Sequence, residues 1–182
     1  RNYDFSPEMY DARLVFSNPI GGYASVGFSQ QVIGRLEGMN EKGLVVGLHF
    51  VNDEHKGEGL LATTIVRMLL EQCSCIKEAI DFMSTIPHGF CYNYSITDSS
   101  GESVIVEAAP EKQYVIFETP LMCTNHFESK HLKDKNMKNI NESPSFANEA
   151  KKLEKAEKKA AKKAKRKEGG VGFLILKIVI AV

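Results

Sequence analysis

The sequence predicts an α+β fold with a largely antiparallel sheet and two consecutive helices on one face. Two observations carry this prediction. Residues 14–51 and 91–124 alternate apolar and polar side chains, which is the pattern of strands. Between these regions, residues 57–87 place apolar side chains at helical spacing. Strands grouped before and after grouped helices are typical of α+β proteins with mainly antiparallel pairing.

The first strand region ends in a hairpin signal. The stretch GMNEKGLVVGLHFVN contains an Asn-Glu-Lys-Gly turn in which Gly43 can adopt the left-handed backbone. A buried strand from Leu44 to Val51 should follow it. Upstream, residues 14–37 combine alternating apolar side chains with scattered glycines, so we expect further strands there.

Two helices should follow. Apolar residues recur every three or four positions in both, at Leu61, Ile65, Met68 and Leu69 and again at Ile76, Ala79, Ile80 and Met83. A break near Ser74 separates the helices, where this serine can cap the second one, and Pro87 ends it.

The second strand region follows these helices. Asp98-Ser-Ser-Gly-Glu predicts a hairpin loop. Strands are expected at residues 103–108, 114–117 and 121–124.

The zero net charge of the 182 residues conceals two unlike parts. Residues 150–168 contain ten Lys and Arg against three acidic residues, which leaves thirteen basic and twenty acidic residues elsewhere. We therefore expect three segments: a domain over residues 1–129, a polar and Lys/Ala/Glu-rich segment, helical or disordered, over 130–168, and an apolar tail over 169–182.

Both later segments leave alternatives open. The basic arm, residues 150–168, has no interleaved aromatic residues, so a solvated charged segment explains it as well as contact with nucleic acid or an anionic membrane. The tail is shorter than the roughly 20 apolar residues that a spanning helix needs. A buried strand, an interfacial anchor and part of a longer apolar segment all fit it. The compartment stays open.

The cysteines do not indicate a metal site. Their positions (Cys73, Cys75, Cys91 and Cys123) lack the spacing of zinc ligands, and we expect all four to be reduced. We expect no metal and no cofactor.

Three short stretches carry side chains suited to chemistry, each with an ordinary explanation as well. Arg1 and Asp4 would face opposite sides of a strand but converge at a bend. Asn125 follows an apolar segment, where a functional amide or an ordinary turn can stand. His49 lies in a predicted buried strand, where hydrogen-bonded packing is the usual role. By spacing alone, none of these residues assigns a function.

Five stretches, in this order, resemble the choloylglycine hydrolase family. They are RNYDF, GMNEKGLVVGLHF, VRMLLEQCSCIKEAIDFM, SITDSSGESVIVEAAP and LMCTNHF, spread over residues 1–127. This group of linear-amide C–N hydrolases includes conjugated bile acid hydrolases, penicillin V acylases and the isopenicillin-N acyltransferase type. The resemblance implies an N-terminal-nucleophile fold for residues 1–129, a four-layer αββα sandwich that is incomplete here.

The resemblance also implies a catalytic set. The family's nucleophile is a cysteine at the mature amino terminus, whose α-amino group accepts the proton; it is expected upstream of Arg1. Arg1 is similar to the arginine beside that nucleophile, and Asp4 to the aspartate that orients the terminal amine. Asn125 is similar to the asparagine of the oxyanion hole. His49 matches the position whose backbone N–H serves the oxyanion and whose side chain bears on substrate choice. A further arginine of the family, downstream of Asn125, has no counterpart.

The expected function is hydrolysis of a non-peptide linear amide in a small N-acyl substrate, such as a bile salt conjugate, a penicillin or an N-acyl amino acid. Acyl transfer through the same acyl-enzyme is one alternative. A non-catalytic homologue or fragment that binds an anionic partner through the basic arm is another. We expect the chain as given to be inactive without its nucleophile. A second copy of the chain is a further candidate partner.

Overall fold

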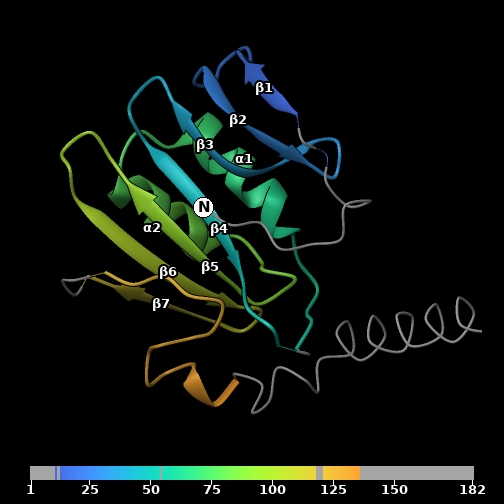
Figure 1. Cartoon of the computed structure of the whole chain (residues 1–182), viewed down its shortest axis with the longest axis vertical. Helices are drawn as coiled ribbons and strands as arrows, with labels where there is room; N and C mark the ends of the chain where they lie inside the picture. The colour runs from blue at the N-terminus through green and yellow to red at the C-terminus, as the bar shows by residue number, and fades with distance from the viewer. Residues whose placement is uncertain (1–10, 12, 54, 118–120, 136–182) are drawn as a thin grey trace, which may run out of the picture. The chain divides into compact units, whose positions relative to one another are not determined.

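Seven strands form one antiparallel sheet in the order in which they occur in the sequence (Figure 1). The computed structural model describes residues 11, 13–53, 55–117 and 121–135. All of them belong to one compact unit that ends at Asn136. The strands are β1 (Leu14–Ser17), β2 (Ser25–Gln30), β3 (Gly34–Asn40), β4 (Val45–Phe50), β5 (Tyr92–Thr97), β6 (Ser103–Ala109) and β7 (Lys112–Ile116). Each pairs antiparallel with the next. The predicted α+β class is confirmed.

Two helices connect β4 to β5 and cover one face of the sheet, as predicted (Figure 1). Helix α1 (Ala62–Gln72) packs mainly on β3 and β4, and α2 (Ile76–Thr85) contacts β6. The core between helices and sheet is built from the apolar stripes of both helices and from alternate residues of the strands, among them Val46, Leu48, Tyr94, Ile96, Val104 and Val106. Within the described residues, no helix is long and apolar enough to cross a membrane.

The β3–β4 hairpin has the predicted turn and is tied to α1 by a buried asparagine. Gly43 adopts φ +84°, which the absence of a Cβ permits. The side chain of Asn40 donates to the carbonyl oxygens of Leu70 (2.9 Å) and Cys73 (2.7 Å). Its Oδ1 accepts the N–H groups of Lys42 and Leu44 at 3.1 and 3.0 Å. The amide therefore satisfies both the turn and the last carbonyls of α1.

Helix α2 is capped from the neighbouring β5–β6 hairpin. Asp98 accepts the N–H of Ile76, the first residue of α2, at 3.0 Å, and its other oxygen accepts the N–H of Ser100 at 3.0 Å. The N–H of Ile76, with the hydroxyl and N–H of Ser100, lowers the pKa of Asp98. The predicted capping serine, Ser74, is instead bound by Glu78, which accepts its N–H and hydroxyl at 2.7 and 2.8 Å.

The face of the sheet without helices has an exposed half and a covered half. On β1–β4 the register puts five exposed apolar side chains on this face, namely Leu14, Phe16, Phe28, Met39 and Val45, of which Phe16 is 78% exposed. On the other half, Phe127 and Leu132 are fully buried against Val51, Cys91 and Ala109.

The segment after β7 differs from the prediction in one respect. Residues 121–124 form no strand, so that expectation is wrong. The side chain of Asn93 in β5 attaches them to the sheet by donating to the carbonyl of Thr124 at 3.0 Å. They do not pair with a strand through their backbone. Leu132, beyond the domain boundary predicted at residue 129, is buried in the same cluster as Phe127. The described residues supply one sheet and one helical layer, and the rest of the αββα sandwich stays a prediction.

Candidate functional site

The structure describes two of the four residues predicted for the site. Arg1 and Asp4 lie outside the described residues. His49 is half-buried in β4, and Asn125 is exposed in a bend after β7. The catalytic roles of all four stay predictions. The two described residues are connected through a third, Asn93 of β5, which the sequence did not single out.

A row of polar residues crosses the helix-free face. The register places His49 opposite Asn93, and Asn93 opposite Glu107. Residues directly opposite on antiparallel strands project their side chains to the same face. Because their sequence neighbours belong to the core beneath the helices, these three side chains lie on the other side of the sheet.

The imidazole of His49 is held within this face by Ser95. Its Nε2 lies 3.1 Å from the hydroxyl oxygen of Ser95, and that hydroxyl donates to the carbonyl of Gly47 at 3.4 Å. The contact with Ser95 positions the imidazole with either neutral tautomer, because a hydroxyl can both donate and accept.

The backbone direction around His49 follows from the ladder. The N–H of Val51 donates to the carbonyl of Cys91 at 3.4 Å. N–H directions alternate along a strand, so the N–H of His49 also points to β5. The N–H groups of Leu48 and Phe50 point to the β3 side. The last residue of β4 in the β3–β4 register is Gly47.

Asn93 fixes the backbone on both sides of Asn125. Its Nδ2 donates to the carbonyl oxygens of Thr124 (3.0 Å) and His126 (2.9 Å). Asn93 itself is 1% exposed, so these hydrogen bonds are shielded from water. Asn125 therefore presents an exposed side chain from a backbone that is held at its two neighbours.

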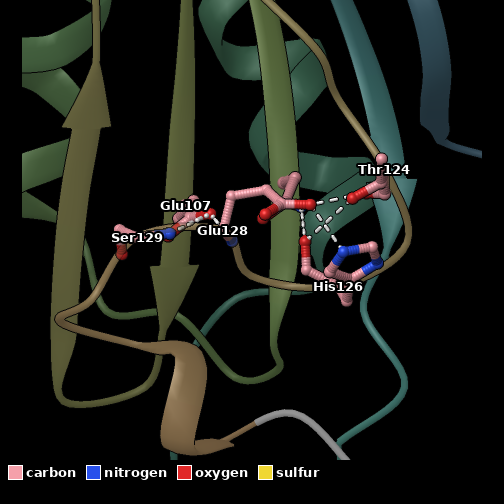
Figure 2. A network of polar contacts seen from close by, with 6 residues as sticks. Glu107, Thr124, His126, Glu128 and Ser129 are labelled. Carbon is pink, nitrogen blue, oxygen red and sulfur yellow. Dashed lines mark hydrogen bonds and ion pairs between the residues drawn. The ribbon is translucent and has the colours of Figure 1, made fainter.

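Glu107 holds the next part of the same loop (Figure 2). This carboxylate, in the middle of β6, is buried. It accepts the N–H of Glu128 at 2.5 Å and the N–H of Ser129 at 3.2 Å. Two backbone donors thus satisfy an acid that the fold removes from water.

The exposed side of the loop carries an ion pair (Figure 2). His126 Nε2 lies 2.5 Å from Glu128 Oε1, and the hydroxyl of Thr124 donates to the carbonyl of His126 at 3.3 Å. Below them, Phe127 packs into the buried cluster. We name residues 124–129 the clamped loop, because buried hydrogen bonds, an apolar anchor and this surface pair all fix it.

The clamped loop is suited to hold a hydrogen-bond donor in a fixed place. Donors that need no reorganisation stabilise developing charge most effectively, and the loop supplies this condition for the amide of Asn125. Asn93 was not predicted as a site residue, because its role depends on strand register. Glu107 had a signal in the sequence, because a lone acid within the apolar run VIVEAA indicates a buried, hydrogen-bonded carboxylate.

In the part of the chain that the structure describes, no cluster of three His, Cys, Asp or Glu could hold a metal.

The sequence also matches a known family. Residues 1–171 match the family model described as acyl-coenzyme A:6-aminopenicillanic acid acyl-transferase. The chain belongs to this family. The resemblance to the linear-amide hydrolases and the isopenicillin-N acyltransferase type is thereby confirmed, and with it the coarse assignment to a family of amide hydrolases and acyltransferases. No curated protein matches the chain.

Several solved structures are similar to this member of the acyl-transferase family. Penicillin V acylase from Agrobacterium tumefaciens is 26% identical over 52% of this chain and 32% of its own, with a TM-score of 0.45. A variant of conjugated bile acid hydrolase from Clostridium perfringens is 21% identical over 53% and 36%, with a TM-score of 0.43. An N-acylethanolamine-hydrolyzing acid amidase orthologue from Caenorhabditis elegans is 16% identical over 64% and 56%, with a TM-score of 0.48. The chain thus spans about a third to somewhat over half of these proteins.

Proposed function

We propose that this chain carries the oxyanion-binding part of a cysteine-dependent hydrolase of linear amide C–N bonds in small N-acyl substrates. The nucleophile is a cysteine that precedes Arg1 in the natural protein. Membership of the acyl-transferase family supports this reaction class. The observation that carries the assignment of the site is the pair of hydrogen bonds by which Asn93 fixes both neighbours of Asn125.

The proposed chemistry uses the terminal amine of that cysteine as its base. An α-amino group has a pKa of about 7.7–8.0, so it can take a thiol proton and return it near neutral pH. Arg1 lowers the pKa of the thiol by its charge, and Asp4 orients the amine. The thiolate attacks the amide carbonyl, the C–N bond breaks, the amine leaves with the proton, and water then cleaves the thioester.

In this proposal the negative oxygen of the tetrahedral intermediate is bound by two donors. One is the side-chain NH₂ of Asn125. The other is a backbone N–H beside His49. The resemblance gives this role to the His49 position, but the N–H of His49 is directed at β5, so we assign the role to a neighbouring residue of the same strand. The side chain of His49, held by Ser95, bears on the choice of substrate.

The first experiment is an intact-mass and amino-terminal determination on the protein from its natural source. A mature cysteine upstream of Arg1 supports the proposal, and its alkylation should then abolish amide hydrolysis. A natural chain without such a cysteine overturns it. Binding to a polyanion that weakens steeply with salt would then support the alternative in which the basic arm acts as a binding segment.

The second experiment tests Asn125 in the natural, cysteine-bearing form. Asn125→Ala should lower kcat by about 10²–10³ with little change in KM, since the amide acts on the transition state. Asn52→Ala is the matched control. An unchanged kcat in Asn125→Ala would remove this residue from the site. Adding a primary amine as acceptor and analysing the products by mass spectrometry separates acyl transfer from hydrolysis.

A further inference from the structure

Two arginines from different elements lie at the end of the β2–β3 turn. Arg35 is in β3, and Arg67 is in α1, the helix that packs on β3 (Figure 1). Nη1 of Arg35 donates to the carbonyl of Gly34 at 3.0 Å. Nη1 of Arg67 donates to the carbonyl of Ile33 at 3.3 Å. The two guanidinium groups therefore bind consecutive carbonyls of the same short segment.

Arg35 is a buried cation, because the residue is only 5% exposed. Its aliphatic stem passes Gly27 of β2, where a Cβ would lie 3.3 Å from Cδ of Arg35. Gly27 is opposite Gly38 in the register, and a Cβ at Gly38 would lie 2.7 Å from Cδ1 of Leu70 in α1. Because opposite residues face the same side of a sheet, the stem of Arg35 runs on the side that the helices cover.

No acid forms an ion pair with Arg35 among the residues that the structure describes. Glu71 is engaged by Arg67, whose Nε donates to its Oε1 at 2.8 Å. Burial, and then the charge of Arg67, lower the pKa of the Arg35 guanidinium, while Glu71 opposes this shift. An arginine stays charged even so. Two cations beside one acid thus leave one positive charge without a counterion, which is costly for a buried group.

The remaining nitrogens of both side chains can reach a ligand. Nε and Nη2 of Arg35 have no partner among the described residues and are not enclosed, so both reach solvent. They lie on one edge of the guanidinium, where two parallel N–H bonds form the fork that binds two oxygens of an anion. Arg67 uses Nε on Glu71 and Nη1 on Ile33, which leaves its Nη2 for a ligand. Donors from two side chains are therefore open.

We propose that Arg35 and Arg67 bind a phosphate group, with two of its oxygens on the fork of Arg35 and a third on Nη2 of Arg67. A tetrahedral phosphate presents oxygens in several directions, whereas one fork uses both oxygens of a carboxylate. The anion supplies the counterion that Arg35 lacks. The ligand is free phosphate or the phosphate of a small monoester. Neither arginine belongs to the clamped loop or to the row of polar residues on the helix-free face, so this binding is independent of the proposed amide hydrolysis.

The test is an NMR titration of the full 182-residue chain with inorganic phosphate, glycerol 3-phosphate and acetate at constant ionic strength. Phosphate should shift the backbone amides of residues 33–35 to saturation, and acetate should bind about tenfold more weakly. Equal affinity for glycerol 3-phosphate supports a monoester as the ligand, and binding of inorganic phosphate alone supports the free ion. No saturable shift with either phosphate, or equal affinity for acetate, overturns the proposal.

Substitutions on α1 assign the charges and leave the buried Arg35 in place. Arg67→Gln should weaken phosphate binding about tenfold, because a charged donor is lost. Glu71→Gln should strengthen it about threefold or more, because the competing negative charge is removed. Arg13→Gln is the matched control, since Arg13 also pairs with an acid, Asp11, and it should bind as the wild type does. Unchanged affinity in Arg67→Gln, or weaker affinity in Glu71→Gln, contradicts the proposal, and the gain expected in Glu71→Gln is one that a loss of folding cannot produce.

Discussion

Asn93 of β5 holds the backbone on both sides of Asn125: its buried amide donates to the carbonyl oxygens of Thr124 at 3.0 Å and His126 at 2.9 Å. Replacing the NH₂ donor of Asn93 by an oxygen is the most direct test of the clamped loop. In Asn93→Asp, an oxygen replaces the donor and faces two carbonyl oxygens. We expect a loss of about 1–3 kcal/mol in the free energy of unfolding, measured with urea. A loss below about 0.5 kcal/mol, the range of ordinary surface substitutions, would show that the clamp contributes little.

Glu107 provides the second test of the clamped loop. In Glu107→Gln the shape is kept, but the charge-assisted bonds to the N–H groups of Glu128 and Ser129 become neutral ones. The expected loss is about 1–3 kcal/mol in the free energy of unfolding. Glu102→Gln is the matched control, since this exposed residue should change stability by no more than about 0.5 kcal/mol. Equal effects of the two substitutions would contradict the role given to Glu107.

Asp98 should make the stability of the protein depend on acid. Its pKa is lowered in the folded protein, mainly by the N–H of Ile76. A lowered pKa means that the folded state favours the charged form, so the contribution is present above the unfolded value near 3.8 and is lost as pH falls through the folded value. The difference in unfolding free energy between wild type and Asp98→Asn should therefore shrink on acidification from about pH 5. A difference that is constant with pH would contradict the cap.

The thiol of Cys73 should react with alkylating reagents more slowly than that of Cys75. Burial raises its pKa to about 12 in the folded protein, so very little reactive thiolate exists at about pH 8. Pulse alkylation with iodoacetamide at that pH, followed by peptide mass spectrometry, should label Cys73 far more slowly than Cys75, which is only half-buried. Rapid labelling of Cys73 would contradict its position in the core.

The same thiol should make stability fall at high pH. Its pKa is about 12 folded against 9.0 in an exposed thiol, so above pH 9 the unfolded state ionises first and is favoured. The stability advantage of the wild type over Cys73→Ala should be constant below pH 9 and decline towards pH 12. Urea unfolding of both proteins at several pH values measures this, and an advantage that persists undiminished at the alkaline end would contradict it.

Local sequence signals predicted the elements that depend on local chemistry. Gly43 marked one hairpin, the Asp98 loop marked another, and the helical stripes marked α1 and α2. The β2–β3 turn carried no such signal, because Gln31 and Val32 adopt left-handed backbone without the glycine or asparagine that usually announces it. The hydroxyl of Thr63, 32 residues away in sequence, holds Gln31 instead.

The candidate site was harder to predict because its connections run across strands. His49, Asn93 and Glu107 become neighbours only through register, which no short motif states. Residues 121–124 were expected to be a strand because their apolar content fits one. An apolar segment outside the strand ladder has the same composition as a strand, and only the hydrogen bonds separate the two.

The exposed half of the helix-free face has a practical consequence for anyone who handles this chain. Phe16 and Phe28 are exposed to water on the adjacent strands β1 and β2. Apolar surface of this kind drives self-association and dye binding. Solubility should therefore limit the concentration at which the chain can be studied alone. Polar replacements at these two positions are the natural way to obtain a well-behaved sample.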